Sequence, residues 1–132
     1  MGQPAAKQGD RVLGVDIHIV MVPSPGGPIP TPMPHPFSGI LNSGLSNDVK
    51  IMGKPAAIVN STADNTPPHI ASPPGTSFQK KPDDKATIKL GSFTVKINGK
   101  MAARNGDMAE TCNDPANAPI GTVLAVGTVM IG

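Results

Sequence analysis

The sequence predicts an all-β fold built from three β-hairpin repeats around one axis, and three observations support this class. No window of the 132 residues carries apolar residues at helical spacing without an interrupting proline or glycine. A short motif centred on Ala-Ala occurs three times. Two of these copies follow a run of alternating, β-branched residues, which is typical of a strand.

The three copies of the motif define the three units. They read "MGQPAAKQGD" at 1–10, "MGKPAAIVNS" at 52–61 and "NGKMAARNGD" at 98–107. Each copy starts near a glycine, which suits a tight turn because glycine adopts positive φ without steric cost. The small alanines leave space for another strand to come close. Two copies end in Gly-Asp, whereas the middle copy ends in Asn60-Ser61.

Strand-like runs precede the second and third copies and complete two hairpins. These runs are "DVKIM" at 48–52 and "SFTVKI" at 92–97. The first copy has no strand before it, and the last run, "GTVMIG" at 127–132, has nothing after it. We therefore expect the two chain ends to pair, which closes a ring of three units that bury a core together. The residues expected on these hairpins are Val49, Ile51, Val95, Ile97, Val129 and Ile131.

The composition predicts one domain with a thin core. The chain contains 16 Pro and 15 Gly, and its only aromatic residues are three Phe, so a small core of this kind often needs a staple. A single Cys excludes an internal disulfide, which directs attention to a metal ion. The net charge of +2 comes without a basic block, so no nucleic-acid partner is predicted. The N-terminus lacks the apolar segment of a secretory signal, and no run is long enough for a membrane helix.

The three histidines and the cysteine are candidate metal ligands. His18 and His69 each lie 16 residues after the turn glycine of their unit (18 − 2 and 69 − 53), and Cys112 lies 13 residues after that of the third unit (112 − 99). With His35 they form a complete His3Cys set for tetrahedral zinc, which predicts a structural site and favours zinc over iron. Taken singly, each also fits an ordinary surface histidine or a small buried cysteine. Their spacing matches no short zinc motif.

The stretch "PTPMPHPF" at 30–37 surrounds His35 with prolines. His35 has no counterpart in the other units and lies in a long insert, 22–46; a second insert covers 65–90. Because proline fixes φ, we interpret the stretch as a stiff loop that carries His35 to the metal site at low entropic cost.

The repeats, the stretch "GSFTVKINGKMAARNGD" and the following "TCNDP" resemble PAAR-domain proteins over essentially the whole chain. The resemblance implies a small cone of three pseudo-threefold hairpin repeats, closed by the N- and C-terminal strands, with zinc at the tip. The implied ligands are His18, His35, His69 and Cys112. The three copies read "PAAK", "PAAI" and "MAAR", so none spells Pro-Ala-Ala-Arg.

The same resemblance implies a function. PAAR-domain proteins cap the trimeric VgrG-like spike of contractile injection machines, which include type VI secretion systems, extracellular contractile injection particles and phage-like tails. We therefore expect residues 1–132 to be a single structural domain without an effector extension, one chain per spike trimer, that helps to pierce and briefly contacts a target membrane. Effector cargo is a further possible partner. The protein is expected to be made in the cytoplasm, assembled at the particle tip and delivered outside the cell or into a target cell.

Two other classes of function fit parts of the sequence. A small zinc hydrolase needs an open coordination position and a carboxylate base, for which Asp107 and Glu110 near Cys112 are the candidates. A β-repeat adhesin or sugar-binding module is disfavoured because the chain has no Trp or Tyr to stack on sugar rings.

Overall fold

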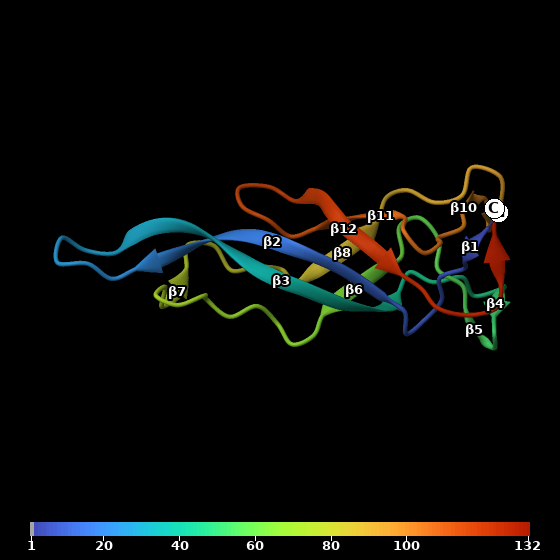
Figure 1. The fold of residues 1–132 in the computed structure, drawn as a ribbon, viewed down its shortest axis with the longest axis horizontal. Coiled ribbons are helices and arrows are strands. Elements are labelled where there is room, and N and C mark those ends of the chain that lie inside the picture. Colours follow the sequence, from blue (N-terminus) through green and yellow to red (C-terminus); the bar gives the residue numbers. More distant parts are fainter. Residues whose placement is uncertain (1) are drawn as a thin grey trace.

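The computed structural model describes residues 2–132 and is built from β-strands and connecting turns, without a helix that could cross a membrane among those residues. The molecule tapers from a blunt end, which holds the C-terminus, to a narrow point (Figure 1). The all-β cone predicted from the sequence is therefore confirmed. The strands are β1 (Gln3–Pro4), β2 (Arg11–Val22), β3 (Ile29–Ser43), β4 (Lys50–Ile51), β5 (Lys54–Pro55), β6 (Thr62–Asn65), β7 (Ser77–Phe78), β8 (Lys85–Ile88), β9 (Lys96–Ile97), β10 (Lys100–Met101), β11 (Met108–Thr111), β12 (Ala118–Leu124) and β13 (Met130–Ile131).

Three short hairpins form the blunt end. Strand β4 pairs with β5 and β9 pairs with β10, as the repeats predict. The third hairpin is assembled from the two chain ends, since β1 pairs antiparallel with β13, Gln3 opposite Ile131. The expected closure is thus confirmed. Each hairpin contributes one isoleucine to a shared apolar cluster, namely Ile51, Ile97 and Ile131, which are 5–8% exposed.

The turns of the two continuous hairpins need positive φ at both central residues. Met52 and Gly53 have φ of 52° and 82°, and Asn98 and Gly99 have φ of 53° and 77°. Two successive positive φ values are the signature of a type I′ turn, whose twist matches that of the flanking strands. The turn glycine of the repeat is therefore required by backbone geometry.

The second alanine of each motif builds a closed ring of hydrogen bonds around the axis. The amide of Ala6 donates to the carbonyl of Ala103 at 2.9 Å, Ala57 donates to Ala6 at 3.0 Å, and Ala103 donates to Ala57 at 3.0 Å. All three alanines are fully buried. Because three backbones meet here, a larger side chain has no room, which explains why the repeat conserves Ala-Ala among its own copies.

A second turn also repeats in the three units. Gly9, Asn60 and Gly106 have φ of 91°, 80° and 89°, and asparagine tolerates this left-handed region better than most residues, so Asn60 replaces glycine in the middle copy. The next side chain then accepts a hydrogen bond from a backbone amide three residues earlier. These bonds join Lys7 to Asp10 at 3.0 Å, Ile58 to Ser61 at 3.0 Å and Arg104 to Asp107 at 2.7 Å.

The middle of the cone is a closed barrel of six antiparallel strands. Its order is β12-β11-β8-β6-β3-β2, with β12 pairing back onto β2, and β7 adds to the far edge of β2. The barrel encloses the main core, in which the larger side chains include Val12, Phe37, Leu41, Ile88 and Val123.

The pointed end is a long hairpin of β2 and β3. The two strands stay paired from Arg11 opposite Ile40 to Val22 opposite Ile29, so the predicted stiff loop around His35 is instead part of a strand. The alternating prolines face positions of β2 whose backbone groups bond elsewhere. For example, Ile19 pairs with Pro32, but its amide donates to Asp114 and its carbonyl accepts from Gln79. Proline is tolerated in a strand where its missing N–H points away from the ladder. The period of two in the prolines is therefore a strand signal.

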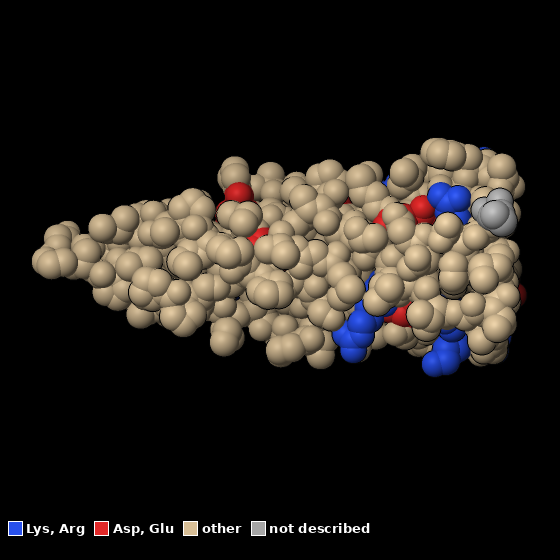
Figure 2. Space-filling model, viewed as in Figure 1, with Lys and Arg blue, Asp and Glu red and all other residues tan. Residues whose placement is uncertain are grey.

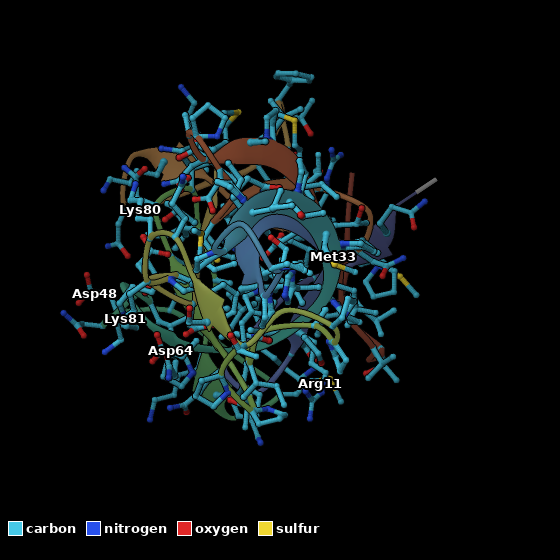
Figure 3. All side chains as sticks on the ribbon, turned by 90° about the vertical axis from the view of Figure 1, so that its left-hand side faces the viewer. Arg11, Met33, Asp48, Asp64, Lys80 and Lys81 are labelled. Carbon is cyan, nitrogen blue, oxygen red and sulfur yellow. The ribbon has the colours of Figure 1, made fainter. Side chains whose placement is uncertain are left out.

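The outer part of the long β2–β3 hairpin carries no charged side chain. No Lys, Arg, Asp or Glu lies between Asp16 and Asp48, which covers the whole outer part of the β2–β3 hairpin. On the face drawn in Figure 2 the basic side chains gather toward the blunt half. Viewed along the axis from the point, the labelled charged residues lie around the periphery (Figure 3).

Candidate metal centre

One metal-type residue from each unit meets in the narrow half of the cone. His18 lies on β2, His69 follows β6, and Cys112 follows β11. One donor atom from each of these residues and one from Asp16 lie within 4.8 Å of one another. The sequence predicts His18, His69 and Cys112 as donors together with His35, but it does not predict the aspartate.

His18 is the residue whose environment best fits a metal ligand. Its side chain is 1% exposed, and neither ring nitrogen has a hydrogen-bond partner within residues 2–132. Nδ1 lies 3.5 Å from Asp114 Oδ2, which is an electrostatic contact without hydrogen-bond geometry. Because a buried polar group without a partner is costly, an unpaired imidazole in this position fits a metal ligand.

Asp16 is a fully buried carboxylate at the centre of the group. Its Oδ2 accepts hydrogen bonds from His69 Nε2 at 2.9 Å and from Cys112 Sγ at 3.3 Å. Its Oδ1 accepts a short hydrogen bond from the hydroxyl of Thr111. Asp16 and His18 occupy alternate positions of β2 and therefore face the same side, so the sequence "VDIHIV" at 15–20 carried a signal that placed them together.

His69 is held from both sides of its ring. Nδ1 accepts from the Asn65 side-chain amide at 3.2 Å, while Nε2 faces Asp16. Its backbone amide donates to Asp84 Oδ1 at 2.8 Å, which fixes the loop after β6. These contacts orient the imidazole, as outer contacts of metal-binding histidines do.

Cys112 is a buried thiol in an environment that opposes its ionisation. Burial, reinforced by the nearby Asp16 carboxylate, raises the pKa of Cys112 to about 12. A thiol binds metal as the thiolate, so a bound cation would have to displace this proton.

His35 lies beside the group, but both of its nitrogens have partners. Its ring centroid is 5.5 Å from the rings of both His18 and His69. Nδ1 lies 2.9 Å from the carbonyl of Met33, and Nε2 accepts from the amide of Ser72 at 3.2 Å. Burial lowers the pKa of His35, and the hydrogen bond to Met33 opposes this shift. His35 is thus a neighbour of the candidate donors, and its role as a ligand stays a prediction.

Hydrogen bonds from the "TCNDP" stretch at 111–115 connect the candidate metal centre to β2 of the long hairpin. The Asn113 side chain accepts from the amide of Ile17 at 2.7 Å, and the Asp114 side chain accepts from the amide of Ile19 at 2.9 Å. The amide of Asp114 in turn donates to the carbonyl of Ile17 at 2.8 Å. These side chains replace a missing strand along β2, and they place Cys112 against His18.

The carboxylates suggested for a zinc hydrolase lie outside this group. Asp107 is paired with Arg104 at 2.9 Å in the repeated turn, and Glu110 lies on β11 at a position opposite Thr87 of β8. Neither contributes to the candidate donor set.

The donor set fits a divalent metal ion. Two imidazoles, a thiol and a carboxylate are all recognised zinc ligands, and a cavity of about 50 Å³ lined in part by His18 and Cys112 lies beside them. A cavity of this size is sufficient for a water molecule or an ion.

The chain matches the model of a known protein family. The family model described as PAAR motif matches residues 20–115, which include every candidate ligand except His18, and Asp16 also lies before it. A search of curated proteins found no match.

Proposed function

Because the chain belongs to the PAAR motif family, a structural family of spike-tip proteins in contractile injection systems, we propose that it caps a trimeric VgrG-like spike and pierces a target membrane with its pointed end. The machine would be a type VI secretion system, an extracellular contractile injection particle or a phage-like tail. On this proposal the protein is made in the cytoplasm, assembled into the particle and delivered outside the producing cell or into its target, with cargo as a further possible partner.

The observation that carries the capping proposal is the pseudo-threefold blunt end. Three equivalent hairpins and the ring of Ala6, Ala57 and Ala103 give one chain three similar faces. A symmetric trimer presents three identical surfaces at its end, so one such chain can contact all three in the same way. This arrangement supports one cap per spike.

The side chains exposed at the blunt end suit a partly apolar interface. Met52 and Met130 lie on the hairpins or their turns and are 52% and 57% exposed, and Val129 is 40% exposed. Exposed apolar residues at one end of a small protein support a docking surface there. Exposed lysines border it on the two continuous hairpins, at Lys50, Lys54, Lys96 and Lys100.

The uncharged point supports the piercing proposal. Moving a charged side chain into hydrocarbon is costly, and residues 17–47 contain none. The backbone of the β2–β3 hairpin is paired along its length, so fewer polar groups are left to be desolvated.

Zinc is the proposed staple of the tip. His18, His69 and Cys112 supply three donors, and the sequence resemblance proposes His35 as the fourth. A structural zinc site contributes about 10–16 kcal/mol of apparent binding free energy, which is comparable to the ~5–15 kcal/mol stability of a whole domain. For a cone with few large core side chains, this contribution would decide whether the narrow half resists load.

The capping proposal is tested by mixing the purified chain with its cognate trimeric VgrG-like spike protein and measuring the mass of the complex. We expect one chain per trimer. Met52→Glu places a charge on the proposed interface and should abolish the complex, whereas Val15→Glu, on the exposed side of β2, should leave it intact. Failure of the unaltered chain to bind, or equal binding by both variants, would contradict the proposed surface.

A further inference from the structure

A hollow of about 430 Å³ lies between the second and third units, beside the β9–β10 hairpin of the blunt end (Figure 1). Its side chains come from Val59, Asn60, Phe93, Lys96, Lys100 and Met101. We propose that this hollow binds an acidic peptide segment with one apolar anchoring side chain, supplied by a protein other than the spike trimer. The inference goes beyond the proposed function, because a threefold spike presents three identical surfaces, whereas the apolar lining of the hollow occurs at one unit boundary.

The backbone contacts at the three unit boundaries are equivalent, so the hollow can be compared with its two counterparts. The amide of Val59 donates to the carbonyl of Met101 at 3.0 Å. The equivalent hydrogen bonds at the other two boundaries join Gln8 to Pro55 at 2.9 Å and Asn105 to Pro4 at 2.8 Å. A polar residue and a proline therefore replace the apolar pair at both of the other boundaries.

Phe93 occupies a position that is polar or glycine in the other units. Each unit has one valine whose carbonyl accepts a hydrogen bond from the first alanine of its motif copy, namely Val49, Val95 and Val129. Phe93 lies two residues before Val95, where the other units have Asn47 (49 − 2) and Gly127 (129 − 2). The Phe93 side chain is 75% exposed. An exposed phenylalanine beside an apolar hollow favours a docking site.

The border of the hollow is basic. Lys96 and Lys100 are exposed, and no Asp or Glu lies among the lining residues. Neither lysine has an ion-pair partner within residues 2–132. Two free positive charges next to an apolar surface complement a partner that carries acidic side chains next to an apolar one. Lys50 and Lys54 hold the same strand positions in the second unit, so the apolar lining is what distinguishes the hollow.

A peptide segment fits this site better than a lipid surface. Lipid phosphates also attract lysine, but segments that bind anionic membranes by charge usually carry about four to eight Lys or Arg. Two lysines line the hollow. Its concave shape also suits the insertion of one side chain, as ligand sites are generally concave and mostly apolar with a few polar groups at fixed positions.

Binding of short synthetic peptides to the unaltered chain tests the proposal and needs no spike protein. Each peptide carries one Leu, Met or Phe flanked by Asp and Glu at varied spacing. Two matched sets carry Lys in place of the acidic residues or Ser in place of the apolar one. We expect the acidic, apolar set to bind at least ~10-fold more tightly than either matched set, with amide NMR shifts centred on Val59, Phe93 and Met101. Equal binding by the three sets, or no binding, would overturn the proposal.

Substitutions distinguish the hollow from its counterpart in the second unit. Phe93→Asn gives the third unit the residue that the second unit has, and Lys96→Glu reverses one charge. Each should weaken peptide binding at least ~10-fold and shift Tm by less than ~2 °C, because both side chains are exposed. Lys50→Glu is the matched charge reversal in the second unit and should leave binding unchanged. Asn47→Phe adds an exposed phenylalanine there without the apolar lining and should create no second site.

Two results of these measurements would contradict the assignment. Equal losses from Lys96→Glu and Lys50→Glu would show that general charge attracts the peptide, which would overturn the proposed location. Binding to vesicles of phosphatidylcholine and phosphatidylserine that is tighter than to any peptide, and that is lost in Phe93→Asn, would identify a lipid surface as the ligand instead.

Discussion

Ser61 provides a sharp test of the repeat architecture, because one hydroxyl holds two buried backbone groups. Ser61 Oγ accepts from the amide of Ile58 at 3.0 Å and donates to the carbonyl of Gly44 at 2.9 Å, and the side chain is 0% exposed. Ser61→Ala leaves both backbone groups without these partners. An unsatisfied buried group costs about 1–3 kcal/mol, and the hydroxyl itself no longer needs to be desolvated, so we expect a total loss of about 2–4 kcal/mol.

The assay is thermal and urea unfolding followed by circular dichroism, at fixed zinc concentration. For a chain of this size 1 kcal/mol corresponds to about 4 °C in Tm, so the melting temperature should fall by roughly 8–16 °C. The matched control is Ser43→Ala, at the exposed end of β3, which should shift Tm by less than ~2 °C. If Ser61→Ala behaved like this control, the reasoning that ties the repeated turn to stability would be refuted.

Two further predictions concern the metal and the edge of β3. Removal of metal with a chelator should lower Tm by more than ~10 °C, reversibly on zinc addition, and His69→Ala or Cys112→Ser should reproduce the loss; an unchanged melting curve would contradict the site. Replacing Pro30 and Pro32 together by Thr should restore amides that point away from β2 and so allow another chain to pair with this edge, which increases self-association. Sedimentation velocity measures this against a Pro25→Thr control in the apex turn. Equal sedimentation of the unaltered protein and both variants would refute the idea that the prolines block edge-to-edge pairing.

The repeated features of the fold could be predicted from the sequence because the three copies of the motif can be compared with one another. The motif predicted the two hairpin turns, and the missing strand of the first copy predicted the pairing of β1 with β13. The shared offset of His18 and His69 likewise predicted that they meet. In each case the residues themselves show the local requirement, which is either a glycine that allows positive φ or an equal distance from the turn glycine of the unit.

The features that occur once were harder to predict. The proline stretch around His35 predicts a loop because proline usually interrupts a strand. It forms a strand instead, because every second position of an edge strand needs no N–H. Asp16 was missed because a single aspartate in a strand pattern is usually exposed. Its burial depends on the closure of the barrel against Thr111 and Cys112, which are distant in sequence. Closure and register of this kind follow from long-range packing.

The position of the metal-type residues explains how a cone with unequal units can act as one body. The long β2–β3 hairpin belongs to the first unit alone, so a force on the point under the proposed function enters through that unit. His18 lies on this hairpin, whereas His69 and Cys112 come from the second and third units. A metal ion shared by the three would therefore pass load from the hairpin to the other units at the level where the barrel ends. The Asn113 and Asp114 contacts to β2 reinforce the same junction. The blunt end needs no such link, because its three units already hold one another through the ring of alanine hydrogen bonds.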